Sequence, residues 1–181
     1  MIHLAGLKET FLDFPNSEDI AVILFTYGCS HNCMGCQSPS LQDPFGGEVF
    51  SKEELLNLIL DRCKGNATNK VVFSGGDPLY HTQSSREQME DLLWIVDYLE
   101  RNEYECCIYT GYTYEQVKSF YPRELLGPKF FKCGRYMESL KDKDMGKYED
   151  SFILASTNQR FLVRIEDTHN YQSSESHIIH I

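Results

Sequence analysis

Three cysteines close together in the sequence are the residues best suited to chemistry. Cys29, Cys33 and Cys36 follow one another at spacings of four and three residues. Closely spaced thiolates suit a soft metal ion or an iron–sulfur cluster. Most such clusters are held by four cysteines, so a cubic cluster bound by these three would keep one iron without a protein ligand. An open coordination position is typical of catalytic zinc sites, and we extend that rule to iron.

The residues alone leave three other uses of these cysteines open. Together with His31 they could hold a structural zinc ion, although structural zinc ligands usually come as separated pairs. Two of them could form a disulfide, although nothing marks the chain as secreted. A fourth cysteine from elsewhere, such as Cys133, could complete the cluster of a simple electron carrier. Cys63, Cys106 and Cys107 fit better as small apolar core residues.

The residues before the cysteines indicate how the chain presents them. The apolar run 20–25 reads as a buried strand. Gly28 then releases the backbone into a loop. The sequence therefore predicts three thiols on a short loop at the end of a core strand.

A second buried strand, at 71–73, ends in a comparable loop. Gly75 and Gly76 permit a close approach to the backbone, and Asp77 adds a charged acceptor at the same place. Backbone carbonyls and a carboxylate are the acceptors that a ligand's ammonium group needs.

Helices alternate with the predicted strands. Capping boxes predict helices that begin after Ser51, Ser85 and Thr113. Further strands are predicted at 105–110, 129–133 and 161–165. Three strand-then-helix units in order predict an α/β fold with a mostly parallel sheet, whose functional loops meet at the carboxyl ends of the strands. The period of these units is too short for the eight units of a complete barrel, which predicts a partial, open (βα) barrel.

Length and composition fit one soluble domain of 181 residues. We expect its core at about 20–165, with an N-terminal segment 1–19 in which 11–14 forms a short strand or covers the barrel mouth, and a polar tail at 166–181. The formal net charge of −10 argues against a nucleic-acid partner. We expect no membrane span and no signal peptide, and therefore reduced thiols in the cytoplasm.

The pattern Cys-x-x-x-Cys-x-x-Cys after a strand resembles the radical S-adenosylmethionine (AdoMet) superfamily. The resemblance implies a [4Fe–4S] cluster whose open iron is chelated by the amino and carboxylate groups of AdoMet. An electron from the cluster would cleave AdoMet to methionine and a 5′-deoxyadenosyl radical. No catalytic side chain beyond the cluster ligands is then needed.

Within that superfamily the chain resembles the activating proteins of the anaerobic ribonucleoside-triphosphate reductase. The similar stretches are Cys29-x-His31-x-Cys33-x-Gly35-Cys36, Thr110-Gly111-Tyr112 and Asn158-Gln159-Arg160. Gly35 stands where the wider family commonly has an aromatic residue. The chain departs from the activators at Ala155, where they have glycine, and at Cys133, where they have aspartate.

The resemblance implies a set of site residues. The cluster ligands would be Cys29, Cys33 and Cys36. The AdoMet site would be lined by Gly35, Cys36, Gln37, Gly75, Gly76, Asp77, Thr110 and Asn158.

The resemblance also implies a protein substrate. The radical would take a hydrogen from a glycine near the C-terminus of the reductase, with an electron donor such as flavodoxin or ferredoxin. Two kinds of alternative stay open. The chain could be another radical AdoMet enzyme, either an activase of another glycyl-radical enzyme (formate-lyase type) or an enzyme that acts on a small molecule. It could also be a non-enzymatic iron–sulfur electron carrier.

Overall fold

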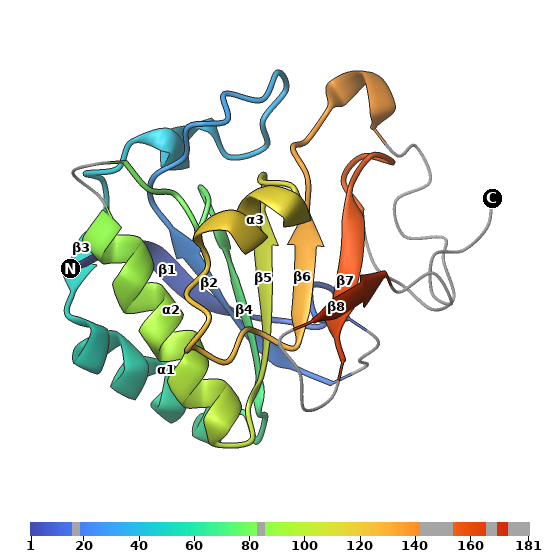
Figure 1. Cartoon of the computed structure of the whole chain (residues 1–181). Helices are drawn as coiled ribbons and strands as arrows, with labels where there is room; N and C mark the ends of the chain where they lie inside the picture. The colour runs from blue at the N-terminus through green and yellow to red at the C-terminus, as the bar shows by residue number, and fades with distance from the viewer. Residues whose placement is uncertain (16–18, 83–85, 142–153, 166–169, 174–181) are drawn as a thin grey trace.

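The computed structural model describes residues 1–15, 19–82, 86–141, 154–165 and 170–173. In this part of the chain, strands form one sheet of eight in the order β3-β1-β2-β4-β5-β6-β7-β8 (Figure 1). The strands are β1 (Ile2–Thr10), β2 (Ala21–Thr26), β3 (Glu48–Phe50), β4 (Lys70–Gly75), β5 (Glu105–Thr110), β6 (Phe130–Cys133), β7 (Arg160–Arg164) and β8 (Tyr171–Ser173).

The four central strands β2, β4, β5 and β6 are parallel, whereas the outer strands at both edges pair antiparallel. The sheet does not close, because β3 and β8 stand at opposite ends of the strand order. This arrangement confirms the predicted α/β class and the partial, open barrel. The carboxyl ends of the parallel strands lie together at one edge, at the top of Figure 1.

The helices are α1 (Lys52–Gly65), α2 (Arg86–Arg101) and α3 (Tyr114–Phe120), with 3-10 turns η1 (Pro39–Gln42) and η2 (Glu138–Leu140). The predicted capping boxes at Ser51 and Thr113 are confirmed, since both side chains accept the expected backbone N–H and both reciprocal bonds form. Ser85 lies outside the described residues. Helices α1 and α2 contact each other and lie side by side against the sheet (Figure 1).

Alternate residues of each strand enter two apolar clusters on opposite faces of the sheet. The cluster beneath the helices includes Leu24, Phe73, Ile108 and Phe131. On the other face, Ile23, Val72, Cys107 and Phe130 form one row across the four parallel strands, because they are register partners. This row forms an apolar layer on the face that carries no helix in the described part of the chain.

Both ends of the sheet differ from the sequence-based expectation. Residues 2–10 form β1, which pairs with β2 and β3, whereas 1–19 was predicted as a segment outside the core. The alternative strand at 11–14 is wrong, because these residues form a bend, although Phe14 packs into the apolar row and is 3% exposed. Within the predicted polar tail, Tyr171–Ser173 forms β8 against β7.

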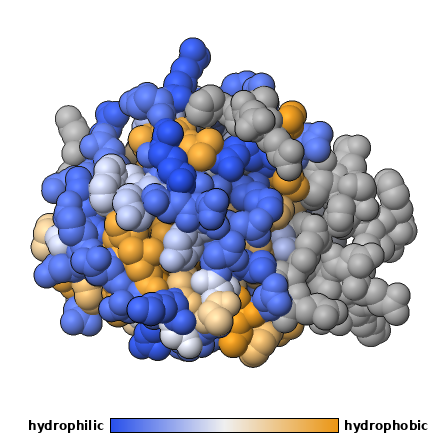
Figure 2. Space-filling model, turned by 90° about the horizontal axis from the view of Figure 1, so that it is seen from below, coloured by the Kyte–Doolittle hydropathy of each residue, from blue (hydrophilic) through white to orange (hydrophobic). Residues whose placement is uncertain are grey.

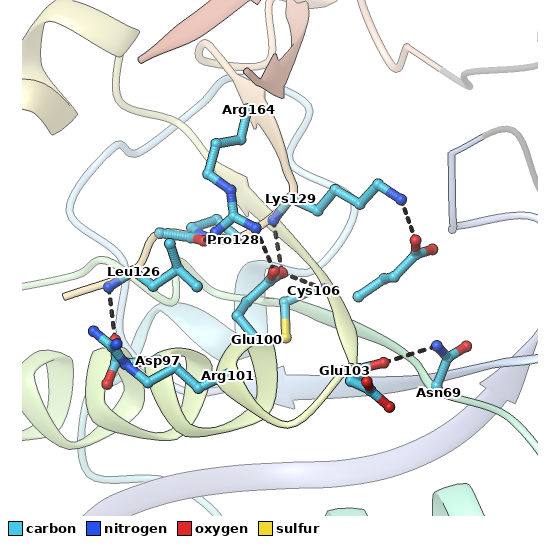
Figure 3. A network of polar contacts seen from close by, with 12 residues as sticks. Asn69, Asp97, Glu100, Arg101, Glu103, Cys106, Leu126, Pro128, Lys129 and Arg164 are labelled. Carbon is cyan, nitrogen blue, oxygen red and sulfur yellow. Dashed lines mark hydrogen bonds and ion pairs between the residues drawn. The ribbon is translucent and has the colours of Figure 1, made fainter. Parts of the chain in front are cut away.

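The amino edge of the sheet is joined by a buried acid. The Glu100 side chain is 3% exposed. One of its oxygens accepts from the backbone N–H groups of Cys106 and Lys129, both at 2.7 Å, and the other accepts from the Arg164 guanidinium at 2.9 Å (Figure 3). A single carboxylate therefore ties α2 to β5, to the entry of β6 and to the end of β7.

The molecule's face at this amino edge is mostly hydrophilic, with smaller apolar areas between the polar residues (Figure 2). None of the helices in the described part of the chain has the length and apolar character that a membrane span requires.

Candidate functional site

The three clustered cysteines line a cavity of about 430 Å³ at the carboxyl ends of the parallel strands. Of the other residues predicted for the AdoMet site, Gln37, Gly75, Gly76 and Thr110 line it too. Gly35, Asp77 and Asn158 are not among its lining residues. The structure therefore brings most of the predicted site to one cavity and places three of its members around it.

The cysteine loop is held by its own backbone and by glycine. Gly28 has a φ of +97°, which favours glycine, and a Cβ there would lie 2.5 Å from the Tyr80 ring. The N–H groups of Gly28 and Cys29 donate to the carbonyls of Leu41 and Gln42 at 2.9 and 3.2 Å. These contacts fold the segment after β2 back on itself, so that its thiols face the cavity.

The glycine pair after β4 allows two loops to touch. Gly75 has a φ of +116°, and a Cβ there would overlap the backbone of Thr26. At Gly76 a Cβ would lie 2.5 Å from the carbonyl oxygen of Gly28. The close approach predicted for these glycines is thus to the chain's own backbone, while their exposed side still lines the cavity.

Asp77 is buried between loops, with an exposed fraction of 1%. Its Oδ2 atom accepts from His31 Nε2 at 2.7 Å, from Thr110 Oγ1 at 3.0 Å and from the Gly111 N–H at 2.9 Å. Its Oδ1 atom accepts from the Leu79 N–H at 2.9 Å. The carboxylate therefore connects the loops that follow β2, β4 and β5.

Gly35 lies against an acidic side chain. Its φ is +71°, and a Cβ at this position would come within 2.7 Å of the Glu138 carboxylate. Glu138 belongs to η2, the turn that follows β6. The space beside residue 35, where the wider family commonly has an aromatic side chain, is thus occupied by a carboxylate in this chain.

Asn158 offers an acceptor close to the site. Its side-chain N–H donates to the Arg135 carbonyl at 2.8 Å. Its Oδ1 atom is buried and has no hydrogen-bond partner among the described residues. Buried polar atoms are normally hydrogen-bonded, so this oxygen has capacity for a further donor.

Leu12 and Asp13, from the 11–14 segment that was expected to form a strand or to cover the barrel mouth, line the cavity. Other lining residues were not singled out from the sequence, among them Tyr109, Lys132 and Tyr136. Lys132 is the most informative, because it is 8% exposed and its ammonium lies 4.5 Å from the centroid of the Tyr109 ring. Burial lowers the pKa of Lys132 to about 8. The sequence signal for it was a lysine within the apolar run Phe130-Phe131-Lys132-Cys133.

The remaining cysteines lie away from the cavity. Cys133 is 4% exposed and belongs to the apolar cluster beneath the helices, together with Phe131 and Leu162. Burial raises the pKa of its thiol to about 12. This position argues against Cys133 as a fourth ligand. Cys63, Cys106 and Cys107 are fully buried core residues, as predicted.

The donor set fits a cluster better than a single ion. Among the described residues, no three histidine, cysteine, aspartate or glutamate side chains come together as the ligands of one metal ion would. The side chains of Cys29, Cys33, Cys36 and His31 do not converge as the alternative zinc site would require, and the Nε2 atom of His31 contacts Asp77. In a cubic cluster each thiolate binds a different iron, so the sulfurs need not converge on one atom.

Burial also affects the ligands themselves. It raises the pKa of the Cys29 thiol to about 11 in the metal-free chain. Because only the thiolate binds iron, cluster assembly must release this proton.

Comparison with known proteins identifies the family of the chain. Residues 16–161 match the family model described as "4Fe-4S single cluster domain". The anaerobic ribonucleoside-triphosphate reductase-activating protein of Enterobacteria phage T4 is 30% identical over 143 residues, covering 77% of this chain and 85% of that protein. The protein of the same name from Escherichia coli K12 is 27% identical over 143 residues, covering 74% and 86%.

Among solved structures, the crystal structure of QueE from Escherichia coli has a TM-score of 0.45 and 23% identity, covering 62% of this chain and 54% of that chain. The match over 16–161 defines the class, a protein domain built around one [4Fe–4S] cluster. Within this class, the chain belongs to the family of anaerobic ribonucleoside-triphosphate reductase-activating proteins. The resemblance noted in the sequence is confirmed.

Proposed function

We propose that this chain is a radical AdoMet activase that generates a glycyl radical on an anaerobic ribonucleoside-triphosphate reductase. The observation that carries the proposal is the cavity itself. Three thiols from one loop and a glycine pair from the next strand end line the same space, in a chain that belongs to the activator family.

In this proposal Cys29, Cys33 and Cys36 hold the cluster. When bound, the reduced cluster supplies the electron that cleaves AdoMet. The backbone carbonyls around Gly75 and Gly76 accept from the AdoMet ammonium, and Asn158 Oδ1 accepts from a hydroxyl or amine of the ligand.

The cavity walls orient AdoMet and limit water. The row Ile23, Val72, Cys107 and Phe130 lies beneath the cavity as an apolar layer, and Tyr109 and Lys132 lie one step nearer the mouth. Such a layer keeps water from the radical on one side. The open sheet leaves the other side for a protein segment that carries the target glycine.

The partner and setting complete the proposal. We infer the reductase as the protein substrate, and flavodoxin or ferredoxin as the electron donor. All seven cysteines are free thiols, which supports action in the reducing cytoplasm.

The first test is anaerobic reconstitution with iron and sulfide, followed by dithionite and AdoMet. We expect 5′-deoxyadenosine from the unmodified chain and none from Cys33→Ala, because a lost ligand removes the cluster. Cys63→Ala is the matched control, since Cys63 is a buried thiol outside the cavity. It should change stability only.

A colourless zinc protein, or a cluster that leaves AdoMet intact, would contradict the proposed function. The partner is tested separately by adding the reductase and recording its glycyl radical by electron paramagnetic resonance. A radical formed on a formate-lyase-type enzyme, and not on the reductase, would redirect the proposal to that partner.

A further inference from the structure

His31 lies in the middle of the cysteine motif and lines the cavity, and its ring also contacts a neighbouring loop. Its Nε2 atom is 2.7 Å from Asp77 Oδ2, and its side chain is 11% exposed. The contact joins residues that are 46 positions apart in the chain. It thus links the segment that carries the cysteines to the strand end that carries Gly75 and Gly76.

The His31 ring is held on several sides. A Cβ at Gly111 would overlap it, so the absence of a side chain at 111 is what allows the ring to fit. Tyr112 packs edge-on against it, with ring centroids 4.6 Å apart. The Arg135 guanidinium donates to the His31 carbonyl. Both the ring and the backbone at this position are therefore fixed.

The Asp77 carboxylate has little capacity left for a ligand. A carboxylate offers roughly four acceptor sites, and Asp77 already accepts four hydrogen bonds from within the chain. Its backbone N–H donates to the Gly28 carbonyl at 2.8 Å, beside the first cysteine. Asp77 is 1% exposed and does not line the cavity.

We propose that His31 and Asp77 are positioning residues, whose contact holds the cysteine loop over the cavity so that its three thiols face the cluster. The AdoMet ammonium is then met by backbone carbonyls at Gly75 and Gly76, and not by the Asp77 carboxylate as the family resemblance implies. This inference rests on the proposed cluster site and adds a role for the histidine of the motif.

The test uses the reconstituted holoprotein and two readouts other than turnover. The first is the rate at which a strong iron chelator bleaches the cluster, which reports how firmly the loop holds it. The second is the AdoMet concentration needed to change the electron paramagnetic resonance spectrum of the reduced cluster, which reports AdoMet affinity.

Four variants separate the roles. His31→Leu removes the donor and keeps an apolar side chain, whereas His31→Gln keeps an N–H that can reach Asp77. Asp77→Asn turns an NH₂ toward either the Leu79 or the Gly111 N–H, because each carboxylate oxygen faces one of them. His81→Leu is the control, since His81 also stacks on Tyr112 but its Nδ1 atom hydrogen-bonds the Leu79 carbonyl at 2.9 Å.

We expect His31→Leu and Asp77→Asn to bleach on the order of tenfold faster, the factor for one lost hydrogen bond to a charged group. His31→Gln and His81→Leu should bleach at about the unmodified rate. The cluster of the double variant, His31→Leu with Asp77→Asn, should bleach no faster than that of Asp77→Asn alone, because both changes break the same contact.

Two results would overturn the proposal. One is an unchanged bleaching rate in His31→Leu. The other is an Asp77→Asn protein that keeps its cluster as firmly as the unmodified chain but needs much more AdoMet, since that would make Asp77 a ligand. Failure of the proposed function is a separate result, because the unmodified chain would then hold no cluster or leave AdoMet intact.

Variants that lose structure are recognised by circular dichroism of the metal-free proteins. If His31→Leu unfolds, the comparison of His31→Gln with Asp77→Asn still tests whether the His31–Asp77 contact holds the cysteine loop. The first should keep the cluster and the second should lose it faster, and equal bleaching in the two would overturn the proposal.

Discussion

Two buried carboxylates join loops and strands at opposite edges of the sheet. Glu100, at the amino edge, accepts from backbone N–H groups at the starts of strands and from the permanently charged Arg164 (Figure 3). Asp77, at the carboxyl edge, accepts from His31, Thr110 and two loop N–H groups. Each acid is almost inaccessible to water. Glu100 connects α2 to three strands, and Asp77 connects three loops.

The difference lies in what the partners do. The partners of Glu100 are parts of the sheet and of α2, so its contacts hold secondary structure together. The partners of Asp77 belong to loops that also line the cavity, so its contacts decide where the thiols and glycines stand. A buried carboxylate thus stabilises the fold at the amino edge and positions the cavity loops at the carboxyl edge. Burial raises the pKa of Glu100 above its ordinary value even beside Arg164, which shows how completely that carboxyl is withdrawn from water.

The largest effect should follow from breaking the amino-edge pair. Glu100→Gln leaves the Arg164 guanidinium, on a side chain 15% exposed, without its carboxylate. We expect a loss of about 3–5 kcal/mol in the free energy of unfolding, measured by chemical denaturation. Glu90→Gln, an exposed pair member on the same helix, should change it by less than about 0.5 kcal/mol.

Glu100→Gln also tests whether Glu100 acts on stability alone and leaves the cavity unchanged. Folded Glu100→Gln should cleave AdoMet as fast per bound cluster as the unmodified chain. A fall in that rate with little loss of stability would break the comparison.

Removing Lys132, a buried cation at the carboxyl edge, should raise the free energy of unfolding, whereas removing the charge of Glu100 should lower it. The pKa of Lys132 is lowered from 10.5 to about 8, so below pH 8 the fold bears the full cost of its charge. Between about pH 8 and 10.5 the unfolded chain binds one more proton than the folded chain, and stability rises with pH. Lys132→Met should therefore stabilise the metal-free chain at pH 7, by at most about 3 kcal/mol, and remove this rise.

Denaturation curves at pH 7, 9 and 10.5 measure the effect of Lys132. If Lys132→Met is more stable at pH 7 but binds AdoMet more weakly, the contrast with Glu100 becomes sharper. The charge of Lys132 would then contribute to AdoMet binding at a cost in stability. A loss of stability at pH 7 would show that contacts of the ammonium outweigh its desolvation.

The smallest effect should come from one donor to Asp77. Thr110→Val removes a hydroxyl that donates to Asp77 and accepts from the Tyr112 N–H at 3.2 Å. We expect a loss of about 2 kcal/mol in stability and faster loss of the cluster to a chelator. Thr110→Ser keeps the hydroxyl and should retain most of both. Equal behaviour of the two variants would assign the effect to packing.

The sequence was most informative where the signal was local. The cysteine spacing, the capping boxes at Ser51 and Thr113 and the buried strands at 71–73 and 105–110 all depend on residues a few positions apart. These features placed the cavity at the correct edge of the sheet, with three of the loops that line it, those after β2, β4 and β5.

The features that escaped prediction depend on distant partners. Strand β1 contains Gly6 and Lys8 and has no clear alternation, so its identity comes from pairing with β2 and β3. The sequence showed Asp77 as an available acceptor, but its three side-chain and backbone partners near residues 31 and 110 are visible only in the folded chain. Strand β8 pairs along only three residues, too few for a pattern.

The strand order carries a consequence for how the chain folds. The strands stand in the sheet in chain order, except for β3, which leaves its place between β2 and β4 and pairs with β1 at the edge. Because β2 and β3 both pair with β1, the intervening cysteine segment is a loop closed by the first strand. Contacts between segments near in sequence close at lower entropic cost than contacts between distant segments, and tend to form earlier. A growing chain can therefore set the three thiols on a closed loop before β4 and the loop that carries Asp77 have been made, and the later strands dock onto it.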